Sequence, residues 1–149
     1  MFGIPWSGKT TYIKENLGWL PIISRDIIRT QLWFTKDDEK KQCSNEEERQ
    51  VTEVQYEEIV KLAKHKISFI IDDTNTNKRY RKKLIQLLKK YKPYIIWIEL
   101  DTPLEICIKR RKWQIHANII AQIKDWIDPL ETDECNEIIH VQYNPNKKN

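Results

Sequence analysis

Residues 3–10 read GIPWSGKT, in which four residues separate a glycine from a Gly-Lys-Thr triplet. In such a stretch successive backbone N–H groups can wrap a phosphate group, and the glycines let the backbone approach closely. Lys9 would reach the outer phosphates of ATP, and the Thr10 hydroxyl would ligate Mg²⁺. Two of the three glycines in the chain stand at the positions that this pattern requires, so we predict a phosphate-binding loop. The residues predicted to contact the nucleotide are Gly3, Ile4, Pro5, Trp6, Ser7, Gly8, Lys9, Thr10 and Thr11.

The two flanks of the loop differ. A helix predicted over residues 10–17, ended by Gly18, would point its positive N-terminus at the bound anion. Ahead of the loop stand Met1 and Phe2, which are apolar as the last two residues of a buried strand would be. We expect most of a first strand to be missing. A start codon assigned too late, a fragment, or another segment filling the place would each explain this.

Short apolar runs alternate with helical patterns along the rest of the chain. Strands are predicted at residues 20–24, 67–71, 94–100 and 137–141, and helices at 27–34, 45–64, 78–91, from 102 onward, and at 119–127. Continuous apolar strands that alternate with helices are typical of a parallel sheet covered on both faces. The predicted fold class is therefore α/β, in three layers.

Several local signals refine these elements. Asn45, with Glu48 three residues later, is predicted to be the N-cap of the long helix at 45–64. Thr102 is predicted to be the N-cap of the helix that begins there. The spacing of apolar residues places Tyr80 and Trp126 on the buried faces of their helices.

Composition limits the class of protein. The 149 residues suit one domain over residues 1–141 with a polar tail over 142–149, and the net charge of +4 permits an anionic partner. Three scattered cysteines argue against a disulfide framework or a zinc site and suit a reducing compartment. No apolar run reaches the roughly 18 residues of a membrane span. We expect a cytoplasmic protein without a membrane partner.

Three polar segments follow predicted strands, where ligands of parallel sheets bind. In SRDIIR, Asp26 could be a general base for a hydroxyl and Arg29 could hold an anion, or Asp26 could merely cap a helix. In IIDDTNTN, Asp73 could orient an acceptor or a metal-bound water, while Asn75 and Asn77 could equally be turn and cap residues.

The third segment is the basic run KRRK at residues 109–112. Its arginines could clamp phosphates during transfer, because charge stabilisation carries most of phosphoryl transfer. A solvated helix end, favoured by the helix dipole, is the alternative.

Together and in this order, GIPWSGKTT, SRDIIR, IIDDTNTN, KRRK and IDPLETDECNEIIHV resemble the P-loop kinase domain of phage-type polynucleotide 5′-kinases and their relatives. Transfer-RNA kinases with a D-D-T-N segment are also similar. The resemblance implies a P-loop NTPase/kinase fold, with Lys9 and Thr10 on ATP and Mg²⁺ and with Asp26 as base on the acceptor hydroxyl. It also implies that Arg29 contacts an acceptor phosphate, that Asp73 places the acceptor, and that Arg110 lies on a lid over ATP.

The chain departs from that family at two places. A second lid arginine would fall at Gln114, so Arg111 or Lys112 would have to substitute. Cys135 stands where a glycine is usual. We expect no phosphatase domain beside this one, and therefore not a two-domain repair enzyme.

Two further features allow more than one interpretation. The helix at 78–91 carries many lysines and arginines, which either track nucleic-acid phosphates or form the wet face of the helix. Trp6 and Trp33 could stack on a base, whereas Trp97 and Trp126 fit apolar core patterns.

The sequence thus predicts an ATP-dependent kinase whose acceptor is most simply the 5′-OH of a nucleic acid. A transfer-RNA-linked group, a nucleoside, a sugar or an antibiotic are alternative acceptors. A third hypothesis is a nucleotide-binding module with little catalysis, because the first strand is short and the lid is weakened.

Overall fold

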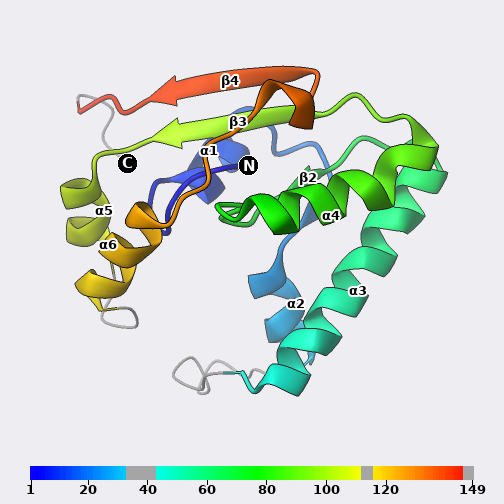
Figure 1. Cartoon of the computed structure of the whole chain (residues 1–149), viewed down its shortest axis with the longest axis horizontal. Coiled ribbons are helices and arrows are strands. Elements are labelled where there is room, and N and C mark those ends of the chain that lie inside the picture. Colours follow the sequence, from blue (N-terminus) through cyan, green and yellow to red (C-terminus); the bar gives the residue numbers. More distant parts are fainter. Residues whose placement is uncertain (33–42, 112–115, 146–149) are drawn as a thin grey trace. The chain divides into compact units, whose positions relative to one another are not determined.

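The computed structural model describes residues 1–32, 43–111 and 116–145 of the chain. The chain forms two compact units (Figure 1): unit 1 consists of Met1–Gly18 and Thr74–Asn149, and unit 2 of Trp19–Asp73. Each unit contains its own pair of parallel strands. Among the described residues, no helix combines the length and the apolar character needed to span a bilayer.

Unit 1 is built on the parallel strands β3 (Ile96–Asp101) and β4 (Glu137–Gln142), which lie side by side in Figure 1. Their register runs from Ile96 opposite Glu137 to Asp101 opposite Gln142. Trp97 is buried, as its apolar surroundings predict. β4 ends one residue beyond the predicted strand, because Gln142 pairs with Asp101.

The residues before the loop extend this sheet. Phe2 donates its N–H to the carbonyl of Ile98 at 2.9 Å and accepts from the N–H of Leu100 at 3.1 Å, in a parallel bridge. On the other side, Gly3 donates its N–H to the carbonyl of Thr74 at 3.1 Å. The short apolar lead therefore has the buried, strand-like setting that the sequence predicts.

In the described part of unit 1, six helical segments accompany these strands. They are α1 (Lys9–Asn16), α4 (Lys78–Leu88), the 3-10 turn η2 (Lys89–Tyr91), α5 (Leu104–Arg110), α6 (Ala117–Asp125) and the 3-10 turn η3 (Thr132–Glu134). Two aromatic predictions are wrong: Tyr80 is 61% exposed and Trp126 is 74% exposed. Trp126 follows the last residue of α6, so the helical spacing that suggested burial no longer applies to it.

Arg81 is an exception within α4, whose cations Arg79, Lys82 and Lys83 are exposed, as both interpretations of this helix require. Its side chain is fully buried, and its Nε donates to Oε2 of Glu134 at 2.8 Å. Its two Nη atoms donate to the carbonyls of Asn75, Asp128 and Pro129 at 3.0, 3.0 and 2.7 Å. A guanidinium with five N–H groups can satisfy that many acceptors at once, so Arg81 joins three chain segments of unit 1.

Unit 2 pairs β1 (Ile22–Ile23) in parallel with β2 (Ile70–Ile71), and adds α2 (Arg25–Leu32) and α3 (Asn45–Lys64). Both strands are shorter than predicted, and Ile67 is 45% exposed rather than part of a buried strand. The burial of Ile23 and Ile70 nevertheless matches the predicted apolar runs.

The start of α3 differs from the prediction by one residue. Ser44, not Asn45, is the N-cap, and its Oγ accepts from the N–H of Glu47 at 3.2 Å. Glu47 completes the capping box by accepting from the N–H of Ser44 at 2.7 Å. This register releases Glu48 from capping, so that its carboxylate is available for other partners.

All observed strand pairings are parallel, and strands alternate with helices along both units. The predicted α/β class with parallel pairing is confirmed.

Candidate active site

The loop at residues 3–10 has the backbone shape that its glycines permit. Gly3 has φ of 144°, Trp6 of 65° and Gly8 of 98°, which are conformations that L side chains rarely adopt. A Cβ atom on Gly3 would lie 2.9 Å from Oγ of Ser7 and 3.2 Å from the carbonyl of Leu100. Glycine is therefore required at the first motif position by space as well as by φ.

Lys9 extends back into this loop. Its Nζ donates to the carbonyls of Gly3 and Ile4 at 3.0 and 2.9 Å, and the residue is 9% exposed. An ammonium group held by two loop carbonyls places a positive charge within the concavity of the loop. The N-terminus of α1, which begins at Lys9, carries the positive end of the helix dipole and can also bind an anion.

A side-chain hydrogen bond from Thr102 holds the loop in place. The hydroxyl of Thr102 donates to the carbonyl of Ser7 at 2.7 Å. Thr102 therefore does not cap α5 as predicted; Pro103 occupies the cap position, without a side-chain cap bond. Ser7 is 2% exposed, and its Oγ has no partner among the residues that the structure describes.

Arg110, the last residue of α5, lies beside the loop. A Cβ built on Gly8 would stand 3.5 Å from its Nη1, and its guanidinium lies 5.3 Å from the ring centre of Tyr143. Both side chains contribute to an open pocket whose lining is Ser7, Gly8, Thr11, Tyr12, Glu15, Leu100, Thr102, Arg110, Val141, Gln142, Tyr143 and Asn144. Sequence reasoning missed Tyr12 and Tyr143, because nothing in their local pattern links them to the loop.

The remaining loop residues have distinct surroundings. Ile4 is buried in an apolar cluster with Cys107 and Ile120, and Trp6 packs against this cluster. Packing against the core gives Trp6 a structural role, distinct from the base stacking that the sequence suggested. Pro5 is half-buried, and Thr10 is exposed in the first turn of α1.

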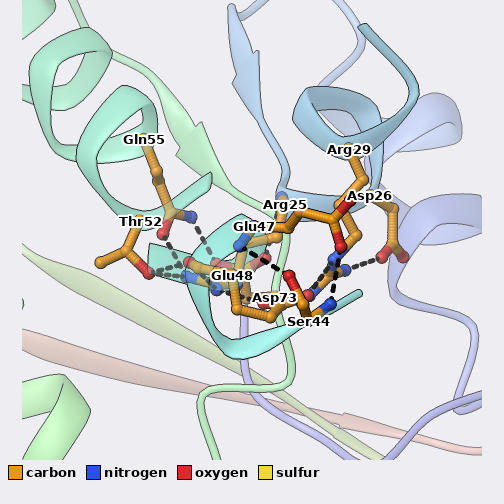
Figure 2. Close-up of polar contacts among 9 residues, drawn as sticks. All are labelled: Arg25, Asp26, Arg29, Ser44, Glu47, Glu48, Thr52, Gln55 and Asp73. Carbon is orange, nitrogen blue, oxygen red and sulfur yellow. Dashed lines mark hydrogen bonds and ion pairs between the residues drawn. The ribbon is translucent and has the colours of Figure 1, made fainter. Parts of the chain in front are cut away.

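The second group of predicted residues lies in unit 2. Asp26 belongs to the first turn of α2, and Oδ1 of its carboxylate accepts from Nη1 of Arg29 at 2.5 Å (Figure 2). The side chain of Asp26 is 91% exposed. The carbonyl of Ser24 accepts from the N–H of Ile28, so Asp26 stands inside the helix and not at its cap.

Glu48 of α3, which sequence reasoning treated as a capping residue, binds two arginines of α2. Its Oε1 accepts from Nε of Arg29 at 2.7 Å, and its Oε2 accepts from Nη2 of Arg25 at 2.6 Å (Figure 2). Hydrogen bonds from Arg29 hold the pKa of Glu48 at about 2, well below its usual value. The same hydrogen bonds raise the pKa of Arg29.

Asp73 lies two residues after the end of β2, and its carboxylate accepts hydrogen bonds from Arg25 and Gln55. The N–H of Arg25 donates to its Oδ1 at 3.2 Å, and Nε2 of Gln55 donates to its Oδ2 at 2.6 Å. Burial raises the pKa of Asp73 above its usual value. The two asparagines that follow are structural, because Asn77 caps α4 and Asn75 donates to the carbonyl of Met1.

The structure thus assembles the predicted residues in two groups. The loop residues and Arg110 lie together in unit 1, and Asp26, Arg29 and Asp73 lie together in unit 2. Nη1 of Arg111 donates to the carbonyl of Ile108 at 2.9 Å. Lys112, Gln114 and Trp33 lie outside the described residues.

Glu48 also makes stability depend on pH. The pKa of Glu48 is lower in the folded chain than in the unfolded chain, so its ionised form favours folding. We expect the unfolding free energy of the wild type minus that of Glu48→Gln to be constant above pH 5. It should shrink as the pH falls from about 4.5 towards about 2. Urea denaturation at several pH values measures this difference, and a difference that grows on acidification would contradict the assignment.

Comparisons with known proteins place these features in a family. A family model described as "AAA domain" matches residues 1–127. A protein of Autographa californica nuclear polyhedrosis virus, named as a bifunctional polynucleotide kinase/RNA ligase, is 26% identical over 118 residues. That match covers 74% of this chain and 17% of the viral protein, so the chain spans less than a fifth of its relative.

Solved structures show the same fold. A chain of the Pnkp1/Rnl/Hen1 complex superposes with a TM-score of 0.62 at 23% identity, covering 77% of this chain and 39% of that one. A sugar kinase from Janibacter sp. HTCC2649 gives 0.62 at 20% identity, covering 95% and 82% of the two chains. A gluconokinase from Sinorhizobium meliloti 1021 gives 0.57 at 14%, covering 95% and 79%. The predicted resemblance to polynucleotide-kinase-like P-loop domains is confirmed.

Proposed function

We propose that this chain, which belongs to the AAA domain family, moves the γ-phosphoryl group of ATP to a hydroxyl group, most simply the 5′-OH of a polynucleotide. The observation that carries this proposal is the loop itself. Its shape requires glycine at position 3, and it encloses the ammonium group of Lys9. Such a loop binds the phosphates of a nucleotide.

The residues present fit ATP and Mg²⁺. A single Cβ atom on Gly3 would fill the space that the loop leaves for a phosphate. The ammonium group of Lys9 is held by two loop carbonyls, and its flexible side chain lets it turn from them to a bound phosphate. Thr10 would hold Mg²⁺, which supplies charge neutralisation on the phosphates when bound. Arg110, beside Gly8, would add positive charge where negative charge develops on the transferred group.

Asp26, Arg29 and Asp73 of unit 2 act on the acceptor. Asp26 takes the proton of the attacking hydroxyl on its carboxylate as the new bond from oxygen to the γ-phosphorus forms. The bond from that phosphorus to the bridging oxygen breaks, and ADP leaves with the electron pair. Arg29 contacts a phosphate of the acceptor, and Asp73 orients it. The exposure of Asp26 supports this role, because a general base must reach its substrate.

Two observations support a polynucleotide as the acceptor. The viral relative is named as a polynucleotide kinase/RNA ligase, and the α4 helix carries exposed cations at Arg79, Lys82 and Lys83. Exposed lysines and arginines bind nucleic-acid phosphates. The fold shared with a sugar kinase and a gluconokinase favours a small hydroxyl compound as the second candidate.

A labelling panel separates these candidates. The chain is incubated with γ-labelled ATP and, in parallel, a 5′-OH oligonucleotide, transfer RNA, nucleosides and sugars. Label on the oligonucleotide alone supports the proposal, and label on a sugar or nucleoside alone supports the second candidate. Retained ATP binding with no labelled acceptor would show a binding module and would overturn the kinase assignment.

Lys9→Met should lower phosphoryl transfer by about 10²–10³-fold, because it removes a positive charge directed at the developing negative charge. ATP affinity should fall with it. The matched control is Lys14→Met, which removes an exposed lysine from the same helix. Initial rates and ATP titrations on both variants test the prediction, and equal losses in the two would contradict it.

A further inference from the structure

Glu48, in the first turn of α3, binds two arginines of α2. Its carboxylate accepts from Nε and Nη2 of Arg29 at 2.7 and 3.0 Å, which is a two-pronged contact. The same Oε2 accepts from Nη2 of Arg25 at 2.6 Å. Figure 2 shows the three side chains converging from the two helices. Two-pronged arginine–carboxylate contacts fix orientation as well as distance.

From Glu48, one line of contacts leads to Asp26. Nη1 of Arg29 donates to Oδ1 of Asp26, while the other side of the same planar guanidinium is held by Glu48 (Figure 2). Because the guanidinium is rigid and planar, fixing its Nε and Nη2 edge also fixes the direction of Nη1. Glu48 therefore sets the position of Oδ1 of Asp26 through Arg29.

A second line leads from Glu48 to Asp73. Arg25, held by Glu48 at one nitrogen, donates through Nη1 to Oγ1 of Thr52 at 2.9 Å and to Oε1 of Gln55 at 3.5 Å. Gln55 in turn donates to Oδ2 of Asp73, and the N–H of Arg25 donates to its Oδ1. Glu48 thus stands between the two carboxylates to which the proposed function gives acceptor roles.

The energetics argue that this network does more than fasten α2 to α3. Its ion-paired side chains are 25–34% exposed, apart from Asp26. Ion pairs that solvent reaches contribute little to stability as a rule. Each of the two helices also buries apolar side chains, among them Ile28 of α2 and Val51 of α3. A precise arrangement of five charged groups is therefore better explained by orientation than by stability.

We infer that Glu48 is a positioning residue of the acceptor site, which orders Arg29 and Arg25 and through them aligns Asp26 and Asp73. The inference rests on the proposed function and deepens it. Glu48 itself touches neither ATP nor acceptor in this account. Its removal would displace the base rather than remove it, and misplacement of reacting groups by about 1 Å can cost on the order of 10²-fold in rate.

The test compares Glu48→Gln with Glu48→Asp and with a matched control. Glu46→Gln removes a carboxylate from the same helical turn, where it pairs with Arg49 at the surface. For each purified chain, kcat, the KM for a 5′-OH oligonucleotide and the Kd for ATP are measured. We expect Glu48→Gln to lower kcat about 10²-fold and raise the acceptor KM, with the ATP Kd unchanged. Glu48→Asp should recover part of the loss, and Glu46→Gln should match the wild type.

Different outcomes would overturn the inference. A lower acceptor KM in Glu48→Gln would show that Glu48 competes with an acceptor phosphate for the arginines. A parallel loss of ATP affinity, or an unchanged kcat, would also contradict a positioning role.

A measurement without substrate separates this inference from the proposed function. Proton exchange at the Nε–H of Arg29, followed by ¹⁵N NMR, should be slow in the wild type and fast in Glu48→Gln. A wild type that labels no acceptor overturns the proposed function. Unchanged exchange in Glu48→Gln overturns the ordering role of Glu48, whatever the wild type phosphorylates.

Discussion

Arg81→Met should lower the unfolding free energy by about 3–5 kcal/mol, the loss expected when one partner of a buried ion pair is removed. Arg81 and Glu134 are 0% and 1% exposed in their side chains. The substitution would leave the Glu134 carboxylate buried without its counter-ion, and Oε1 of Glu134 already lacks a partner among the described residues. Three backbone carbonyls would lose their donor as well. Urea denaturation followed by circular dichroism measures the change.

Two further variants make this prediction specific. Lys82→Met removes an exposed cation from the neighbouring position of α4 and should change stability by less than about 0.5 kcal/mol. Arg81→Met combined with Glu134→Leu should be more stable than Arg81→Met alone, because the uncompensated charge is gone. A double variant no more stable than Arg81→Met alone would contradict the coupling of the two side chains.

The loop was the part of the site most predictable from sequence. Its chemistry is local, since the glycine spacing, Lys9 and Thr10 lie within eight residues. The structure places Gly3 where a Cβ does not fit and directs Lys9 into the loop, as the pattern implies. The helix boundaries of α1 and α3 also follow from local signals, to within one residue at each end.

Long-range partners were not predictable in this way. Arg81 shares the buried face of α4 with Leu84 and Leu88, but Glu134 is 53 residues away, and no local signal identifies it as the partner of this arginine. Similarly, Glu48 cannot be told from its acidic neighbours in the sequence. The structure shows that Ser44 is the N-cap and that Glu47 completes the capping box, so the Glu48 carboxylate binds Arg29 of α2. Thr102 was predicted to be an N-cap because Thr-Pro begins many helices. Its hydroxyl instead donates a hydrogen bond to the carbonyl of Ser7, 95 residues away in the chain.

The lengths of β1 and β2 were overestimated for a related reason. Apolar runs indicate which residues prefer burial, but pairing depends on a partner strand in register. Ile22 and Ile23 pair with Ile70 and Ile71, whereas the residues around them in the predicted runs have no strand partner in the described chain. The exposed Ile67 shows that an apolar residue next to a strand need not enter it.

Asp26→Asn should lower phosphoryl transfer by about 10²–10⁴-fold, the contribution expected of a general base. The substitution keeps the size of the side chain, and its amide oxygen can still accept from Nη1 of Arg29, so α2 should keep its structure. An amide cannot take up the proton of the acceptor hydroxyl, and this alone should account for the loss. ATP affinity should stay at the wild-type value, because the loop residues that hold the phosphates are unchanged. Single-turnover rates and ATP titrations separate the two quantities, and a parallel fall in ATP affinity would assign Asp26 to the metal or to the fold instead.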